Sequence, residues 1–106
     1  MRAIVVGPDD DGLGEALEAE GVEVTRIPEV ATRPALESAG VTDADALVLT
    51  QATGATAIPV ARDINDGVRI VVYAEDDLPD FARGQADLIV DPRLLSVDAV
   101  AEELAA

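Results

Sequence analysis

The chain has 106 residues, of which 22 are acidic and seven are basic, giving a formal net charge of −15 at pH 7. Every basic residue is Arg, and Lys, His, Cys and Trp are absent. Because 49% of the sequence is hydrophobic, the composition excludes a disordered acidic tail and predicts one folded domain over residues 1–106.

The strong negative charge also excludes several classes of partner and chemistry. Nucleic acid and anionic membranes require basic patches, so we expect no binding to either. The absence of Cys and His removes thiol chemistry and the commonest general base, so an enzyme is not the favoured interpretation. The apolar run at the N-terminus is too short for a signal peptide or a membrane span, which predicts a cytoplasmic location.

The carboxylates are typical of a halophilic protein. Repulsion between them fades at molar salt, where the Debye length falls from about 8 Å to about 3 Å. The composition therefore predicts an acidic surface adapted to a cytoplasm of high salt.

The chain alternates short β-rich runs with helical stretches, which is the pattern of a parallel α/β sheet. A buried strand is expected from Arg2 to Val6, followed by the turn of residues 7–14. A short helix from Leu13 to Glu20 ends at Gly21, and a second strand runs from Val22 to Ile27.

The middle of the chain contains the most hydrophobic strand. Thr32 can cap a helix that starts near Pro34 and ends at Gly40. The strand from Ala46 to Thr50 follows, and we expect it to be central in the sheet.

The rest of the chain predicts two more strand and helix pairs. After the loop of residues 51–56, Thr56 is expected to cap a helix from about Ala57 to Asn65. The remaining elements are a strand over Val68 to Ala74, a helix over Asp80 to Gly84, a strand over Asp87 to Val90, and a final helix capped by Ser96.

From residue 41 onward, the sequence VTDADALVLTQATGATAIPVARDINDGVRIVVYAEDDLP is similar to the TrkA-N domain, also called the RCK domain, of potassium-transport regulators. The matching residues are Asp43, Ala44, Asp45, Ala46, Ala61, Arg62, Asn65, Val68, Arg69 and Ala74. The segment QADLIVDP resembles the end of that domain, with Gln85 in place of Gly. The resemblance implies a Rossmann-like fold, a nucleotide ligand (NAD(H) or an adenine nucleotide), and pairing into a homodimer.

The chain departs from this family where the family binds its ligand. The G-x-G-x-x-G turn is replaced by Gly7 and Gly14, seven residues apart. Pro28, followed by Glu29, stands where the family has an acid for the ribose. The chain is also short by about one strand-helix unit near residues 28–31. We therefore predict a Rossmann-like three-layer α/β sandwich with a five-stranded parallel sheet of order 2-1-3-4-5.

The first candidate site is the turn after the first strand. Gly7, Gly12 and Gly14 are candidate phosphate-binding residues, since glycine N–H groups at a helix N-terminus can bind anions. Asp9, Asp10 and Asp11 would then lie against the phosphate, where two like charges at 4 Å cost about 1 kcal/mol in water and about 4 kcal/mol at an effective dielectric of 20. The turn is therefore either a solvated acidic loop that also caps the next helix, or a Mg²⁺ or K⁺ site with or without a nucleotide.

The second candidate site is the loop after the third strand, at the edge where α/β sheets bind ligands. Its candidate ligand-binding residues are Thr50, Gln51, Thr53, Gly54 and Thr56. The alternative is that these residues only cap the next helix and solvate the loop. The same strand order also suits a receiver domain, but that requires an Asp after the third strand and a Lys after the fifth, whereas this chain has Thr50-Gln51 and no Lys.

The sequence thus favours a non-enzymatic regulatory or ligand-sensing module, a degenerate relative of TrkA-N domains, with a homodimer or another protein as its expected partner. The alternative is a functional nucleotide-binding domain in which a cation bridges the aspartates to phosphate.

Overall fold

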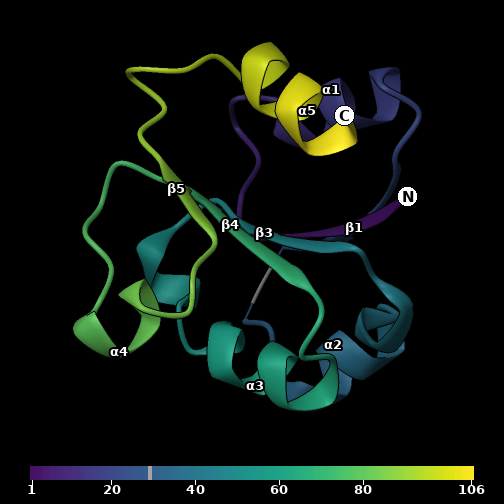
Figure 1. Ribbon diagram of the computed structural model, residues 1–106, viewed down its shortest axis with the longest axis vertical. Coiled ribbons are helices and arrows are strands. Elements are labelled where there is room, and N and C mark those ends of the chain that lie inside the picture. The colour runs from purple at the N-terminus through teal and green to yellow at the C-terminus, as the bar shows by residue number, and fades with distance from the viewer. Residues whose placement is uncertain (29) are drawn as a thin grey trace.

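The computed structural model describes residues 1–28 and 30–106, so Glu29 lies outside the described residues. All the strands lie in one parallel sheet of order β2-β1-β3-β4-β5 (Figure 1). The strands are β1 (Arg2–Val6), β2 (Glu23–Ile27), β3 (Ala46–Leu49), β4 (Arg69–Tyr73) and β5 (Leu88–Val90). The predicted fold class and strand order are confirmed.

Helices cover both faces of this sheet. The helices are α1 (Leu13–Ala19), α2 (Arg33–Ser38), α3 (Ala57–Ile64), α4 (Asp80–Arg83) and α5 (Val97–Ala105). Helices α1 and α5 pack on one face, and α2, α3 and α4 lie on the other (Figure 1). Within residues 1–28 and 30–106, none of the helices has the length and apolar character needed to cross a membrane.

Each face of the sheet has its own apolar layer. Successive side chains of a strand point to opposite faces. In β3, Leu47 and Leu49 therefore pack toward α2 and α3, whereas Ala46 and Val48 pack toward α1 and α5. All four β3 residues are fully buried, which confirms the prediction that this strand is central.

Two of the three predicted helix caps are present. The hydroxyl of Thr32 accepts the Ala35 N–H, and the hydroxyl of Ser96 accepts the Ala99 N–H. Thr56 does occupy the N-cap position of α3, but the predicted side-chain cap is wrong, because its backbone has helical dihedral angles and its hydroxyl makes no capping hydrogen bond. The chain enters α3 through a 3₁₀ turn, η2 (Ala52–Gly54), where the sequence predicted a loop; a second 3₁₀ turn, η1 (Val41–Asp43), was also not predicted.

Polar side chains join the amino ends of the strands. The Asp45 carboxylate accepts the Arg2 N–H at 2.8 Å. The Asn65 amide donates to the carbonyls of Val41 and Ala44, at 2.9 and 3.0 Å. Asp45 and Asn65 both belong to the set that resembles the TrkA-N domain. At these two positions, the residues that resemble the TrkA-N domain make contacts that stabilise the fold.

Arg62 is the centre of the largest of these polar groups. Its guanidinium donates to the carbonyls of Asp66, Val68 and Gln85 and to the carboxylate of Asp87, over 2.6 to 3.1 Å. Asp87 in turn accepts the Ile70 N–H at 2.8 Å. This group ties α3 to the start of β4 and β5.

Asp87 provides a test of this group through pH. Its hydrogen bond from the Ile70 N–H, together with Arg62, holds the pKa of the Asp87 carboxyl below its usual range. A carboxyl with a lowered pKa stabilises the fold above its unfolded pKa of about 3.9, and this contribution disappears as the pH falls through the folded value. Asp87→Asn should therefore lower stability at pH 7, and its difference from the parent should shrink below about pH 4. Urea unfolding across pH 2 to 7 measures this difference, and a difference that stayed constant with pH would contradict it.

Candidate functional site

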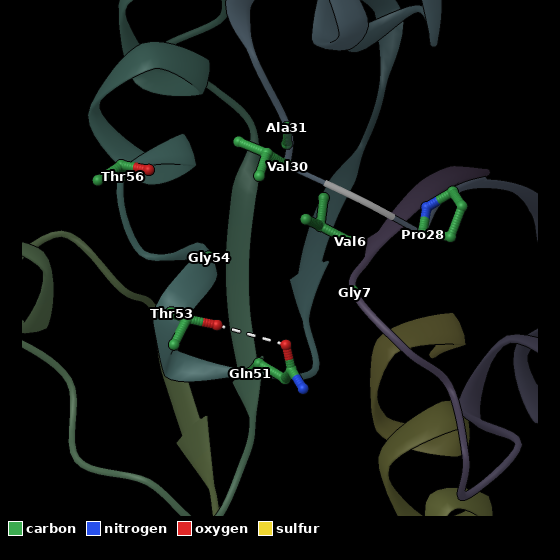
Figure 2. A pocket seen from close by; sticks show the side chains of 9 residues that line it. All are labelled: Val6, Gly7, Pro28, Val30, Ala31, Gln51, Thr53, Gly54 and Thr56. Carbon is green, nitrogen blue, oxygen red and sulfur yellow. Dashed lines mark hydrogen bonds between the residues drawn. The ribbon is translucent and has the colours of Figure 1, made fainter.

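A pocket of about 250 Å³ opens at the carboxyl ends of β1 and β3 (Figure 2). Three separate segments line it: the end of β1, the chain after β2, and the loop between β3 and α3. The lining residues are Val6, Gly7, Pro28, Val30, Ala31, Gln51, Thr53, Gly54 and Thr56. The pocket thus lies at the carboxyl ends of the neighbouring strands β1 and β3, where the strand order reverses. This is the position at which open α/β sheets bind ligands.

Gly7 allows β1 to turn sharply into the pocket wall. Its φ of 100° is a conformation that side-chain-bearing residues rarely adopt, and its N–H donates to the Ile27 carbonyl at 2.9 Å. A Cβ at this position would lie 2.6 Å from the Thr50 hydroxyl oxygen. Thr50 donates this hydroxyl to the Val6 carbonyl at 3.1 Å, so it supports the wall from behind and is not among the lining residues.

The polar rim of the pocket is formed by Gln51 and Thr53. The Thr53 hydroxyl donates to the Gln51 side-chain oxygen at 3.3 Å, and Figure 2 shows the two side chains turned toward one another. Val6 and Val30 supply apolar surface on the other side, and Val30 is 76% exposed. The pocket therefore offers amide and hydroxyl groups next to apolar carbon.

Gly54 lies on the floor of the pocket, in the η2 turn. A Cβ here would lie 3.4 Å from Leu49 Cδ2 and 3.7 Å from Val6 Cγ1, which is ordinary contact. Its φ lies outside the left-handed region, so the backbone would tolerate a side chain. Gly54 therefore leaves space that a methyl group could fill without strain.

The structure divides the predicted binding residues into two groups. Five of them, Gly7, Gln51, Thr53, Gly54 and Thr56, line the pocket. The other three, Gly12, Gly14 and Thr50, do not line it. Gly12 and Gly14 lie at the start of α1, which packs on the opposite face of the sheet, and the Thr50 hydroxyl donates to the Val6 carbonyl.

In the acidic turn, Asp9 caps the start of α1. The Asp9 carboxylate accepts the N–H groups of Leu13 and Gly14, each at 2.7 Å. Over the described part of the chain, no three acidic side chains are grouped so that they could hold a metal ion. The structure thus does not bring Asp9, Asp10 and Asp11 together as a cation site. Because Asp9 already binds the first N–H groups of α1, it occupies the place that a phosphate would need.

Asp9 should therefore matter for stability. Removing a capping carboxylate leaves backbone N–H groups without their partner, so Asp9→Ala should lower the free energy of unfolding by about 1 to 2 kcal/mol. Asp10 is exposed, and Asp10→Ala removes the same charge without that cap. The two variants should differ by at least about 1 kcal/mol in urea unfolding. Equal stabilities would show that the Asp9 contacts contribute nothing.

Val6, Pro28, Val30 and Ala31 line the pocket but were not predicted as site residues. The strand pairing could have indicated them. Because β2 lies parallel to β1, the residues that follow β2 from Pro28 onward leave the sheet at the same edge as the end of β1. Their apolar side chains carry no motif, which is why sequence reasoning passed over them. Glu29, which follows Pro28 at the position where the TrkA-N family has its ribose-binding acid, lies outside the described residues.

The described lining contains groups that bind but none that transfer protons readily. Its polar side chains are those of Gln51, Thr53 and Thr56, which are not ionisable near neutral pH. Among the described residues, the pocket therefore favours recognition of uncharged polar groups over acid–base chemistry.

Comparison with known proteins identifies a family and a shared architecture. Residues 3–104 match DUF7126, described as a family of unknown function. No curated protein matches the chain significantly. The resemblance to the TrkA-N domain stays a prediction, because the matching family is a different one.

Three solved structures illustrate the fold. An orphan response regulator of H. pylori has a TM-score of 0.75 at 12% identity, covering 98% of this chain and 92% of that chain. An atypical orphan response regulator, described as having a phosphorylation-independent regulatory mechanism, has a TM-score of 0.71 at 13% identity, with coverage of 98% and 92%. A candidate pilus assembly protein from Burkholderia thailandensis has a TM-score of 0.65 at 16% identity, with coverage of 99% and 98%. At these identities, the likeness shows the fold alone.

Proposed function

Because the chain belongs to DUF7126, a family of unknown function, we propose its role from its own site: it is a non-enzymatic regulatory module that binds a small, uncharged polar molecule in the pocket between β1 and β3. The observation that carries this proposal is the convergence of three chain segments on one pocket. Five residues chosen from the sequence as ligand-binding residues are among those that line it.

The regulatory part of the proposal draws on the structural neighbours. The two orphan response regulators share the architecture, and one is described as working without phosphorylation. This chain has Thr50 and Gln51 directly after β3, and neither is an acidic phosphate acceptor. A module that responds to a bound molecule, and not to a phosphoryl group, suits these residues. Descent from a TrkA-N domain would be compatible with the same role, but the family match gives it no support.

The alternative, a nucleotide held through a Mg²⁺ or K⁺ ion, has less support. It requires the acidic turn to hold a cation, and Asp9 instead caps α1 through two backbone hydrogen bonds. The charge of −15 further opposes the approach of any phosphate.

A ligand panel tests the proposal. Thermal unfolding in molar KCl should be measured with nucleosides, free nucleobases and nicotinamide, and separately with NAD⁺, NADH, ATP, ADP and AMP, with and without Mg²⁺. Ligand at one hundred times its Kd adds about 2.7 kcal/mol of stability, so a bound molecule is readily detected. We expect shifts only from uncharged molecules. Stabilisation only by nucleotides with Mg²⁺ would favour the alternative, and none from any compound would refute the proposed ligand class.

Gly54→Ala separates binding from stability. The added methyl group should lie in ordinary contact with Leu49 and Val6, and replacing Gly reduces the entropy of the unfolded chain, so stability should rise by about 0.4 to 1 kcal/mol. The same methyl group reduces the pocket, so the affinity for a ligand found in the panel should fall at least tenfold. Gly84→Ala is the control, because its Cβ would lie in open space away from the pocket. Unchanged affinity in Gly54→Ala would place the ligand elsewhere.

We also propose that the acidic surface suits high salt. All six ion pairs found among the described residues involve exposed or partly exposed Arg side chains, and acidic residues outnumber Arg by 22 to seven. Molar KCl should therefore raise the unfolding temperature relative to about 0.1 M KCl, because screening weakens the repulsion between carboxylates. A melting temperature independent of salt would contradict this.

A further inference from the structure

Large apolar side chains are exposed along the β5 edge of the molecule. Phe81 of α4 is 52% exposed and Ile89 of β5 is 48% exposed. Leu94 and Leu95, in the loop before α5, are 80% and 46% exposed. These four residues, called the β5 patch below, are four of the six exposed large apolar residues in the described chain, the others being Met1 and Val30. Figure 1 shows α4, β5 and this loop at one side of the molecule.

The two edge strands of the sheet differ in how they are protected. On β2, the exposed residues include Glu23 and Arg26, and charged side chains are the usual defence of an edge strand. On β5, the residues are Leu88, Ile89 and Val90, and none is charged. The β5 edge is therefore limited only by its short length of three residues, whereas the β2 edge also carries charged side chains.

A groove lies beside Ile89 on the α4 side of the edge. It has a volume of about 250 Å³ and is lined by Asp76, Asp77, Leu78, Arg83 and Ile89. The Arg83 guanidinium donates to the Leu78 carbonyl at 3.3 Å, which links the loop to α4. The groove thus combines the apolar side chains of Leu78 and Ile89 with two carboxylates and one guanidinium.

The leucines on the α5 side are held in place by polar contacts. The Tyr73 hydroxyl donates to the Leu95 carbonyl at 2.8 Å, and burial, with Asp11 adding to it, raises the pKa of Tyr73 and keeps this donor protonated. Arg93 pairs with Asp91 at 2.7 Å at the start of the same loop. The loop is therefore tied down on both sides of Leu94 while that side chain stays exposed.

The charge around the β5 patch decides what could cover it. Residues 75–93 contain six acidic residues, of which Asp87 pairs with Arg62, and Glu75 and Asp91 pair with Arg93. Asp76, Asp77 and Asp80 lie outside the ion pairs found among the described residues. A second copy would bring two such surfaces together, and salt screens the repulsion less at the close, partly buried distances of an interface than on the open surface. A partner with basic groups would complement them.

We propose that the β5 edge docks an extended segment of a partner protein in which apolar and basic side chains alternate. Alternate side chains of a strand point to opposite faces, so such a segment directs its apolar side toward Leu94 and Leu95 and its basic side toward Asp76 and Asp77. Its backbone pairs with β5, as in strand addition to other exposed sheet edges. This inference is independent of the pocket between β1 and β3.

The test uses the whole chain, labelled with ¹⁵N, and a short peptide in which Lys and Val alternate. Two control peptides, with alternating Lys and Ser or alternating Glu and Val, separate charge from apolar contact. We expect the Lys-Val peptide alone to shift the amide resonances of Leu88, Ile89 and Val90 and to slow their hydrogen exchange. Shifts spread over the acidic surface, or equal shifts with the Lys-Ser peptide, would overturn the proposal.

Variants exclude simple charge attraction. Leu94→Asp adds negative charge, so non-specific attraction would tighten binding of the Lys-Val peptide, whereas loss of the apolar contact at Leu94 should weaken it at least tenfold. Thr25→Asp adds the same charge to the opposite edge strand and should not weaken binding. Leu94 is 80% exposed, so its variant should fold. Sedimentation of the unbound chain completes the test. If the chain is a dimer and Leu94→Asp abolishes that dimer, the occupant of the β5 edge is a second copy of the chain and not a basic segment of a partner.

Discussion

Replacing Arg62 by Ala should lower the free energy of unfolding by about 3 kcal/mol, because each hydrogen bond from a charged group contributes about 1.5 to 3 kcal/mol and the sum is only partly additive. The guanidinium makes four hydrogen bonds, the shortest of them 2.6 Å to the Val68 carbonyl, and the side chain is 25% exposed. A Lys ammonium lacks the planar fork of donors that reaches all four acceptors, so Arg62→Lys should recover only part of the loss.

Arg33→Ala is the matched control for Arg62. Arg33 pairs with Asp63 at 2.9 Å on the same helical layer, but their side chains are 51% and 69% exposed. Exposed ion pairs contribute about 0 to 1 kcal/mol, so this variant should be close to the parent in urea unfolding. If the two Ala variants lost equal stability, the Arg62 contacts would have no special structural role.

Gly7→Ala should have an effect of similar size at the other end of the sheet. A residue with a Cβ at a φ of 100° is strained, and the added carbon would lie 2.6 Å from the Thr50 hydroxyl oxygen. Strain and overpacking together should cost about 3 kcal/mol. Because Gly7 also lines the pocket, ligand binding should be lost in the same variant.

A double variant separates the two causes. Thr50→Ala removes the hydroxyl that the new Cβ would meet, so Gly7→Ala combined with Thr50→Ala should lose less than the sum of the two single changes. Gly84→Ala is the control, because a Cβ at Gly84 would meet no other atom and the φ of Gly84 is one that Ala adopts freely. This variant should change stability by less than about 1 kcal/mol. Strict additivity in urea unfolding would show that Thr50 does not contact the new side chain.

The fold was readable from the sequence because its signals are local. Short runs such as Ala46–Leu49 are entirely apolar, as buried parallel strands must be, and Thr32 and Ser96 stand where helices start. The cap expected at Thr56 was wrong for a reason that is local too: the chain enters α3 through the η2 turn, and Thr56 has helical dihedral angles and makes no side-chain cap. The contacts of Asp9 agree with the helix cap that the sequence left open as one alternative for the acidic turn.

The site was predicted in part for the same reason. Gln51, Thr53 and Gly54 were found because the carboxyl edge of a central strand is a general location for ligands. Val30 and Ala31 were missed because an apolar wall contributed by another segment has no sequence motif. The strand order itself supplies the missing information, since β2 lies next to β1 and its chain must leave at the same edge.

The opposite placement of the Arg62 group and the pocket has a consequence for how sequences of this kind can diverge. Substitutions near Gln51 and Thr53 can change what is recognised while leaving the contacts that hold the strand starts intact. In a saturation mutagenesis screen, substitutions in the Arg62 group should therefore prevent folding. Substitutions near Gln51 and Thr53 should leave the fold intact and change ligand recognition.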